Sequence, residues 1–214
     1  MVEICAKAAV GNPETLGDCP FCHRVVATLE EKELDYQLNL INLDDQPEWF
    51  IDEIPSRELP AMKNEHGHWI LQAEEICRII EELHPEPSLD TPPHLVGVGC
   101  NIFGNFEAFL ESDDPDDGTE QALLDELEAF DEHIRENGPY IAGEDVTALD
   151  FSLTPGLLYV PVALPHFKNW EIPEHLTHVR GYLELMCQGH RLRRPLPKIN
   201  ILLQDGSRNS TARI

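Results

Sequence analysis

The spacing of apolar residues differs between the two halves of the chain. Over residues 1–84, short segments with β-branched or alternating apolar residues are separated by turn residues and by stretches with helical spacing. The strand-like segments are residues 2–5, 34–41, 60–62 and 68–71, the last two joined by a turn at 64–67. Helical spacing follows residue 19, recurs briefly near Trp49, and returns over residues 76–83 before Pro85. The pattern predicts the order strand, helix, strand, short helix, strand, strand, helix.

A proline-rich polar segment, residues 85–93, precedes a second half that is helical in pattern to nearly residue 188. Apolar faces cover residues 96–110 and 122–134. The acidic run between them lacks the trailing glutamate of a calcium loop, so we interpret it as a solvated turn. We therefore expect two domains, residues 1–84 and 94–214, joined by a linker at 85–93.

Thr147 and Asp150 have the spacing of a helix capping box and precede an apolar run. We assign this pair a structural role. The histidines are scattered, and the pair at His66 and His68 falls in the predicted hairpin turn, so we expect no metal site from them.

The most informative motif is Cys19-Pro20-Phe21-Cys22, which stands where the first helical pattern begins. A thiolate at that place faces unpaired backbone N–H groups and the positive end of the helix dipole, which lower a thiol pKa from about 8.5 to roughly 3.5–7.5. Pro20 fits the first helical turn, where the missing N–H has no intrahelical partner. The motif predicts that Cys19 is a nucleophile at neutral pH.

Two other interpretations of the cysteine pair remain open at this stage. The pair could be inert helix packing, or it could be half of a zinc site. A zinc site needs a second ligand pair, and no other C-x-x-C or H-x-x-x-H motif of suitable spacing follows. The strand and helix order around the motif is that of a thioredoxin-like domain, which favours redox chemistry.

Composition limits the partners and the compartment. The 214-residue chain has a net charge of −25, from 15 Lys and Arg against 40 Asp and Glu, which argues against nucleic acid and anionic lipid surfaces as partners. Its six cysteines are mostly isolated, and no signal-like segment precedes them, so we expect a reducing, cytoplasmic location. We expect no membrane span, because no apolar run reaches the roughly 18–20 residues that a spanning helix needs. Lys7 is the only lysine before the motif, either a solvated strand end or a local positive charge near Cys19.

A thioredoxin-like half, a proline-rich linker and an all-helical half together resemble the plan of cytosolic glutathione transferases. More specifically, five stretches are similar to plant-type glutathione-dependent dehydroascorbate reductases: EICAKAAVG at 3–11, LGDCPF at 16–21, LEEK at 29–32, VAL at 162–164 and KNW at 168–170. The similarity covers residues 2–188. The GDCPF core alone also fits the related intracellular chloride channel proteins, so the flanking stretches carry the assignment.

The resemblance implies a mechanism and a set of site residues. The Cys19 thiolate would attack a carbonyl of dehydroascorbate, ascorbate would leave with the electrons, and two glutathiones would restore the sulfur through a mixed disulfide. Lys7 would stabilise developing negative charge, and Asp18 would position substrate or pass a proton. The implied substrate-binding positions are Lys7, Asp18, Phe21, Gln46, Leu59, Pro60, Gln72 and Ala73. Glutathione is then a co-substrate, no tightly bound cofactor is expected, and the protein is expected to be a monomer with a glutathione transferase side activity.

The chain departs from the family pattern at several of these positions. The family has serine at position 22, lysine at 46, an acidic residue and serine at 72–73, and histidine at 159, where this chain has Cys22, Gln46, Gln72-Ala73 and Tyr159. Backbone contacts at Ala73 and before a cis-proline at Leu59-Pro60 would not depend on side-chain identity. Cys22 is interpreted as an auxiliary thiol that protects Cys19 through a disulfide.

Three rival functions remain open. A glutaredoxin-like disulfide oxidoreductase would need Cys22 as a resolving thiol, and a channel-like protein would need to bind bilayers. A non-enzymatic binding module of the glutathione transferase fold would have degenerate glutathione contacts, which Gln46 and Ala73 allow. The tail after residue 189 lacks the family's tryptophan-bearing ending. It carries a basic cluster that either complements a helix C-terminus or folds back towards an anionic ligand: Arg191, Arg193, Arg194 and Lys198.

Overall fold

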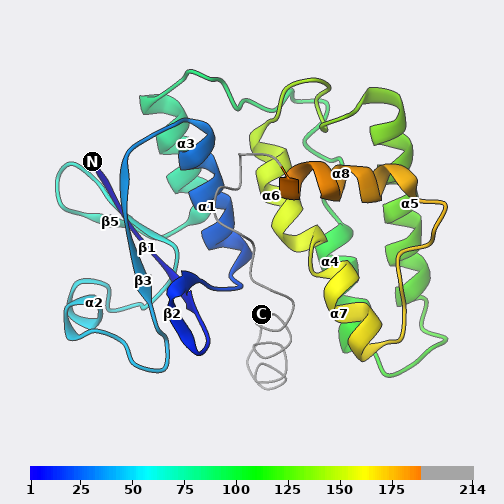
Figure 1. The fold of residues 1–214 in the computed structure, drawn as a ribbon, viewed down its shortest axis with the longest axis horizontal. Helices are drawn as coiled ribbons and strands as arrows, with labels where there is room; N and C mark the ends of the chain where they lie inside the picture. The colour runs from blue at the N-terminus through cyan, green and yellow to red at the C-terminus, as the bar shows by residue number, and fades with distance from the viewer. Residues whose placement is uncertain (189–214) are drawn as a thin grey trace. The chain divides into compact units, whose positions relative to one another are not determined.

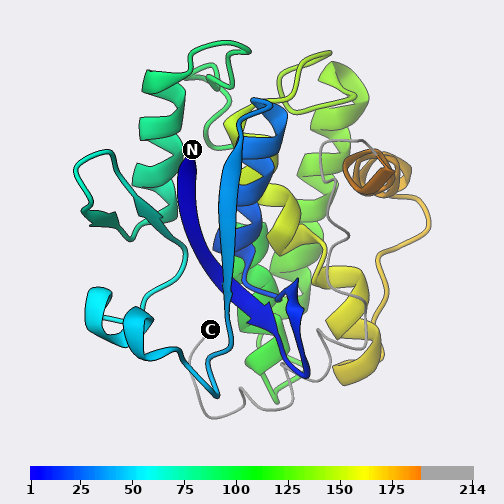
Figure 2. The ribbon, with the colours of Figure 1, turned by 60° about the vertical axis from the view of Figure 1, so that its left-hand side comes forward.

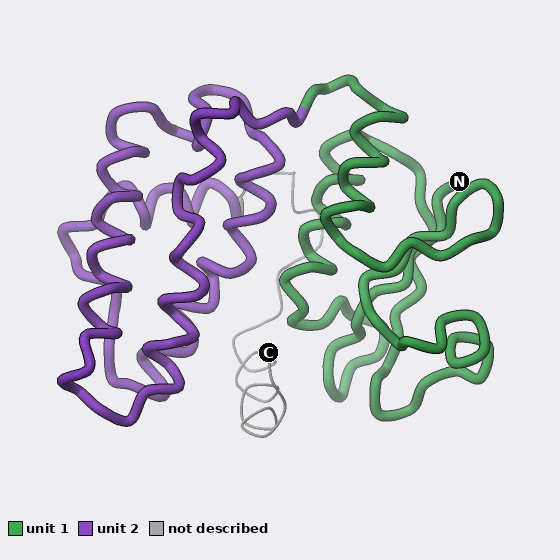
Figure 3. Tube along the Cα trace, turned by 180° about the vertical axis from the view of Figure 1, so that it is seen from behind, with its two compact units in different colours: residues 1–88, 190–214 green, residues 89–189 purple. Residues whose placement is uncertain are grey.

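The computed structural model describes residues 1–188, and the basic cluster with the rest of the tail lies outside the described residues (Figure 1). The described chain forms two compact units, one made of residues 1–88 and one that begins at Leu89 (Figure 3). The division falls inside the proline-rich segment 85–93. Each unit has its own set of buried apolar side chains.

The first unit is a mixed sheet with helices. Its elements are β1 Val2–Ala9, β2 Asn12–Leu16, α1 Pro20–Glu31, β3 Tyr36–Ile41, α2 Glu48–Glu53, β4 Ala61–Lys63, β5 Trp69–Ile70 and α3 Ala73–Leu83. Strand β1 pairs parallel with β3 and antiparallel with β4, and β5 pairs antiparallel with β4 (Figure 2). The register sets Lys7 opposite Ile41, so the end of β1 that leads to the cysteine motif is fixed by its neighbour. This is the thioredoxin-like arrangement that the sequence predicted.

Strand β2 was not predicted, because its own residues do not have a strand pattern. Four of its five residues, Asn12 to Thr15, are exposed or half-buried, and one of them is a proline. The strand exists because Gly11, with φ of +73°, turns the chain back so that β2 pairs antiparallel with the end of β1. The predicted element order was therefore wrong here: a hairpin, not a single strand, precedes α1.

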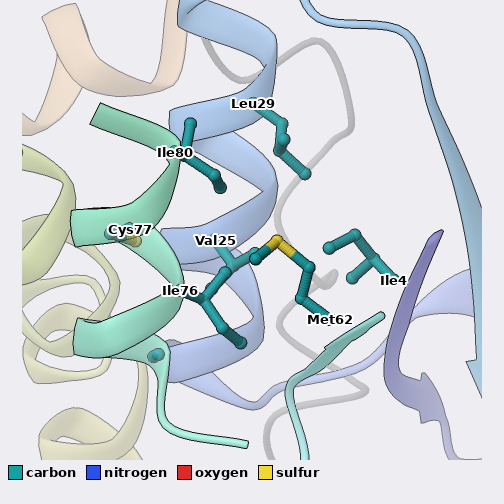
Figure 4. Close-up of a cluster of buried hydrophobic side chains, with 8 residues drawn as sticks. Ile4, Val25, Leu29, Met62, Ile76, Cys77 and Ile80 are labelled. Carbon is teal, nitrogen blue, oxygen red and sulfur yellow. The ribbon is translucent and has the colours of Figure 1, made fainter. Parts of the chain in front are cut away.

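Helices α1 and α3 pack together against β1 and β4. Their shared core is a cluster of buried side chains that Figure 4 shows: Ile4, Val25, Leu29, Met62, Ile76, Cys77 and Ile80. The buried ammonium of Lys32, just after α1, closes this layer. It lies 2.7 Å from the Glu81 carboxylate and donates to the carbonyls of His84 and Pro87 at 2.6 and 2.7 Å. These contacts fix the α1–α3 pair, and with it the start of α1.

The second unit is helical throughout its regular structure. Its helices are α4 Ile102–Glu111, α5 Thr119–Asn137, α6 Ala148–Leu157, α7 Val160–Phe167 and α8 Thr177–Gln188. The helix expected from residue 96 begins only at Ile102, because residues 94–101 form turns that are mostly exposed. The acidic run is a turn, as predicted: Ser112 and Asp117 share a hydrogen bond of 2.5 Å, and Asp117 also accepts from Thr119.

One segment is longer and more apolar than the sequence analysis allowed. Residues Ala148–Phe167 reach a mean hydropathy of 1.2 over a window long enough to cross a membrane. In the structure this segment forms the two helices α6 and α7, and 56% of the window is buried inside the protein. Phe151, Leu157, Val160 and Leu164 are among its buried side chains, so packing within the second unit accounts for the apolar character.

The capping box at the start of α6 is confirmed, and it is the centre of a larger buried network. Asp150 is fully buried, and its carboxylate accepts from the Thr147 N–H at 2.8 Å and the Thr147 hydroxyl at 3.0 Å. It also accepts from the Ile141 N–H and the Tyr182 hydroxyl, both at 3.0 Å. The one carboxylate therefore joins α6, the preceding loop and α8.

Replacing Asp150 by alanine should destabilise the second unit strongly, because four buried donors lose their acceptor at once. We expect Asp150→Ala to lower the free energy of unfolding by about 3 kcal/mol or more, measured by urea denaturation. Asp145→Ala, an exposed carboxylate in the same loop, serves as the control and should change it by less than about 0.5 kcal/mol. Equal effects of the two variants would show that the network adds little.

Candidate functional site

Cys19 is the N-cap of α1, as the sequence predicted. Its backbone is extended, with φ of −66° and ψ of 114°, and Pro20 occupies the first helical position. The main-chain N–H groups of Phe21 and Cys22 lie at this helix start and lower the pKa of the Cys19 thiol, and the first turn carries no acidic side chain. Cys19 thus stands at the position where a residue with a capping side-chain oxygen stands in other helices.

The surroundings favour the thiolate form of Cys19. A hydrogen bond from the Cys22 thiol has the largest effect and, with the N–H groups of Cys22 and Phe21 and the charge of Lys7, lowers the pKa of Cys19 to about 7 although burial opposes it. Cys5, on strand β1, shows the opposite outcome: burial, followed by the charge of Glu3, raises its pKa to about 12. The thiolate of Cys19 is therefore accessible near neutral pH, unlike that of an ordinary cysteine.

Cys22 lies one helical turn after Cys19 and has the opposite character. It is fully buried, its sulfur accepts the Lys7 N–H at 3.4 Å, and its pKa is raised far above the usual range by burial and then by the bond to Cys19. Cys22 therefore remains a protonated thiol whose hydrogen is available to Cys19. Sequence reasoning found the residue but treated it only as a disulfide partner, because the direction of this bond depends on the contact of α1 with β1.

Lys7 and Asp18 form an ion pair beside Cys19. The Lys7 ammonium lies 2.6 Å from the Asp18 carboxylate, and both side chains are largely buried, with 18% and 12% of their surfaces exposed. Lys7 is the last residue but two of β1, and Asp18 directly precedes Cys19. The two are thus brought together as expected, but each charge offsets part of the field of the other at the sulfur.

The remaining predicted binding residues divide into two groups. The peptide bond between Leu59 and Pro60 is cis, as expected, and Leu59 packs on the same buried cluster as Cys19. Phe21 is 55% exposed in the first turn of α1. Leu59 and Phe21 therefore lie near Cys19, the first through packing and the second through its place in the same helical turn.

Gln46, Gln72 and Ala73 lie on other segments. Gln46 precedes α2; its amide donates weakly to Leu43 at 3.4 Å, and its buried Oε1 has no partner among residues 1–188. Gln72 is the N-cap of α3 and Ala73 its buried first residue. No side chain caps this helix start, so its N–H groups are available to a carboxylate, although two acidic residues follow in the first turn.

Two residues that sequence reasoning did not select shape the segment before Cys19. Gly17 approaches β1 so closely that a Cβ would lie 2.5 Å from the Ala8 carbonyl oxygen, and the His23 ring contacts the Gly17 carbonyl. Only the position of Gly17, directly before the Asp-Cys pair, could have drawn attention to it. Within residues 1–188, no group of three or more His, Cys, Asp or Glu side chains is arranged to hold a metal ion.

Comparison with known proteins agrees with this geometry. The family model described as the N-terminal domain of glutathione S-transferase matches residues 18–83. The chain is 49% identical over 185 residues to a rice protein named probable glutathione S-transferase DHAR1, cytosolic, and the match covers 86% of this chain and 87% of the rice protein. Fold and site therefore define a thioredoxin-like protein of the glutathione transferase class.

Two solved structures refine the placement. Dehydroascorbate reductase from Chlamydomonas reinhardtii superposes with a TM-score of 0.84 at 29% identity, covering 97% of each chain. The CLIC homologue EXC-4 from C. elegans superposes with a TM-score of 0.86 at 18% identity, covering all of this chain and 87% of the other, and shows the fold alone. The chain belongs to the DHAR group of the glutathione S-transferase family.

The hydrogen bond from Cys22 can be tested through the reactivity of Cys19. Removing the thiol in Cys22→Ala should raise the pKa of Cys19 by about one unit, whereas Cys22→Ser keeps a donor and should change it much less. The measurement is the pH dependence of Cys19 alkylation by iodoacetamide, followed by mass spectrometry of the Cys19 peptide. An unchanged profile in Cys22→Ala would leave only the backbone N–H groups as the cause of the low pKa.

Proposed function

We propose that the chain reduces dehydroascorbate to ascorbate with two molecules of glutathione and that Cys19 is its redox centre. The observation that supports this most is the Cys19 thiolate at the start of α1, in a chain that belongs to the DHAR group. A thiolate with a pKa near the ambient pH combines nucleophilicity with a substantial ionised fraction, which is the optimum for thiol exchange. Glutathione is a co-substrate here and not a bound cofactor.

The reaction proceeds in three steps. The Cys19 thiolate adds to a carbonyl carbon of dehydroascorbate; water then attacks the sulfur, the carbon–sulfur bond breaks, and its electron pair leaves with ascorbate, which gives a sulfenic acid on Cys19. The first glutathione condenses with the sulfenic acid, releasing water and forming a mixed disulfide. The second glutathione attacks this disulfide, releases oxidised glutathione and restores the thiolate.

Lys7 and Asp18 act on the oxygen of the attacked carbonyl. As the thiolate adds, negative charge develops on that oxygen, and the Lys7 ammonium is the nearby cation that can stabilise it. The Asp18 carboxylate holds the Lys7 ammonium at 2.6 Å, which fixes its position and limits its effect on the resting thiolate. Lys7 accordingly lowers the pKa of Cys19 less than the Cys22 thiol and less than the N–H groups of Cys22 and Phe21.

The state of Cys22 favours a single-thiol mechanism over a glutaredoxin-like dithiol mechanism. A resolving cysteine must itself become a thiolate to attack a mixed disulfide, but the fully buried Cys22 has a pKa raised far above neutral. Cys22 can still condense slowly with an oxidised Cys19 and protect it from further oxidation. Its role is therefore auxiliary: a donor to the thiolate in each turnover and a reserve thiol under oxidative stress.

Glutathione recognition relies on backbone groups more than on side chains. The family's lysine at position 46 is replaced by Gln46, and no side chain caps α3 at Ala73. The open N–H groups at the start of α3 and the main chain at Leu59 would hold glutathione, whereas Gln46 supplies no charge. Membership of the glutathione S-transferase family also favours a transferase side activity. The name of the rice relative supports a cytoplasmic location.

The assignment of the redox centre is tested by two cysteine variants compared in one assay. Cys19→Ser should abolish glutathione-dependent ascorbate formation, with less than about a hundredth of the wild-type kcat, because the reacting atom is removed. Cys22→Ser should keep most turnover but be inactivated faster by peroxide. A Cys19→Ser variant with a tenth of wild-type kcat would contradict the assignment, and loss of turnover in Cys22→Ser would favour the dithiol mechanism.

The role of Lys7 predicts a separation between turnover and thiol reactivity. Lys7→Ala should lower kcat/KM for dehydroascorbate about tenfold, equivalent to about 1.4 kcal/mol, because the developing negative charge loses its cation. The alkylation pKa of Cys19 should change little. Lys63→Ala, which removes a half-buried lysine paired with Glu53, is the control and should leave kinetics unchanged. Unchanged kinetics in Lys7→Ala would return Lys7 to a structural role.

A further inference from the structure

His23 is a buried histidine that the proposed mechanism does not use. It is the fourth residue of α1, only 4% of it is exposed, and its Nε2 lies 2.7 Å from the Gly17 carbonyl oxygen. Helical side chains lean towards the helix N-terminus, so the ring reaches back past Cys19 to the segment that enters the helix. The contact joins the helix to the loop that carries the reacting sulfur.

The Gly17 peptide is held from two sides. Its N–H donates to the Lys7 carbonyl at 2.7 Å, and its carbonyl receives the His23 ring. Its Cα lies so close to β1 that any side chain would collide with the Ala8 backbone, so the segment has no room to move towards the strand. Gly17 is therefore held between β1 and α1 by these two hydrogen bonds, an arrangement that we call the clamp.

The chemistry of the contact determines the form of the ring. A carbonyl oxygen only accepts, so Nε2 must carry the hydrogen. Burial lowers the pKa of His23, although the bond to Gly17 and the charge of Asp18 oppose this, and the ring is neutral near pH 7. A neutral imidazole with its hydrogen on Nε2 donates a hydrogen bond here without placing a cation next to the Lys7–Asp18 pair.

We propose that His23 is a positioning residue whose Nε2–H fixes the Gly17 carbonyl and thereby holds the Asp18–Cys19 segment against β1 and the first turn of α1. Asp18 and Cys19, which directly follow Gly17, are the residues whose geometry the proposed chemistry requires. Asp18 must reach Lys7 at 2.6 Å, and Cys19 must keep the extended N-cap conformation that directs its sulfur at the N–H groups of the first turn. Without the clamp, the segment could rotate and the sulfur would lose those donors.

His23 differs in this from a buried histidine that only fills the core. A packing role predicts that its replacement lowers stability and leaves Cys19 chemistry intact. A positioning role predicts a change in the thiolate that is out of proportion to the loss of stability and that returns when the donor is restored. The role rests on the proposed function, in which Cys19 is the reacting thiolate, but alkylation needs neither dehydroascorbate nor glutathione and tests it separately.

Three variants separate these alternatives. His23→Phe keeps an aromatic ring and removes the donor, His23→Gln supplies an amide N–H of similar reach, and Thr28→Val removes a different buried hydrogen bond on α1, from Thr28 to the Arg24 carbonyl. Each is measured for the free energy of unfolding and for the pH profile of Cys19 alkylation, read on the Cys19 peptide by mass spectrometry.

His23→Phe should shift the alkylation profile of Cys19 to higher pH by about one unit, which reduces the rate at pH 7 about fivefold. His23→Gln should return most of the wild-type profile. Thr28→Val should reduce stability without moving the profile. An unchanged profile in a folded His23→Phe variant, or an equal shift in Thr28→Val, would overturn the proposal.

A measurement on the wild-type protein decides the matter if His23→Phe does not fold. NMR of the imidazole nitrogens should show His23 as the neutral tautomer with its hydrogen on Nε2 across the neutral pH range. The other tautomer would remove the donor from the Gly17 carbonyl and would overturn the proposal. If the wild-type protein does not reduce dehydroascorbate but His23→Phe still shifts the alkylation profile of Cys19, the proposed function is contradicted and the positioning role of His23 remains.

Discussion

A helix begins with N–H groups that have no partner inside the helix, and in this protein the residue placed at that end is a cysteine. Cys19 occupies the N-cap of α1, where the backbone N–H groups of Phe21 and Cys22 help to lower the pKa of its thiol. The rest of the first unit holds this geometry in place. The α1–α3 core and the Lys32 contacts fix the helix. The sheet fixes β1, which carries Lys7 and accepts the Gly17 N–H at the Lys7 carbonyl. The chemical reactivity follows from a general property of helices applied to a residue that can ionise.

The order of the separate effects shows which groups matter most to the resting thiolate. The hydrogen bond from Cys22 has a larger effect than either backbone donor, and the charge of Lys7, which Asp18 partly neutralises, has a smaller effect than each of them. In a chain of net charge −25, a strong unpaired cation at the site would be an exception, and the site instead uses dipoles and a thiol donor. Lys7 is left for the charge that develops during reaction.

Much of the fold and of the site could be predicted from local patterns. The start of α1 at the cysteine motif, the hairpin turn between β4 and β5, and the capping box at Thr147 are each set by residues close in sequence, and each is present. Strand β2 was missed because it forms only through its pairing with β1. The turns at residues 94–101 were missed because the apolar spacing there is helical, although the residues are mostly exposed. The contacts of Cys22 and His23 were missed for the same reason: both depend on how closely the chain around Gly17 approaches the strand, which no local pattern records.

The claim on which the account depends most is that the Cys22 thiol and the N–H groups at the start of α1 bring the pKa of Cys19 close to neutral pH. Thiolate ultraviolet absorbance, titrated in the wild type and in Cys19→Ser, isolates this one sulfur as the difference between the two curves. The account predicts a difference curve with a midpoint at about pH 7. A midpoint at the ordinary thiol value of about 8.5 or higher would contradict it.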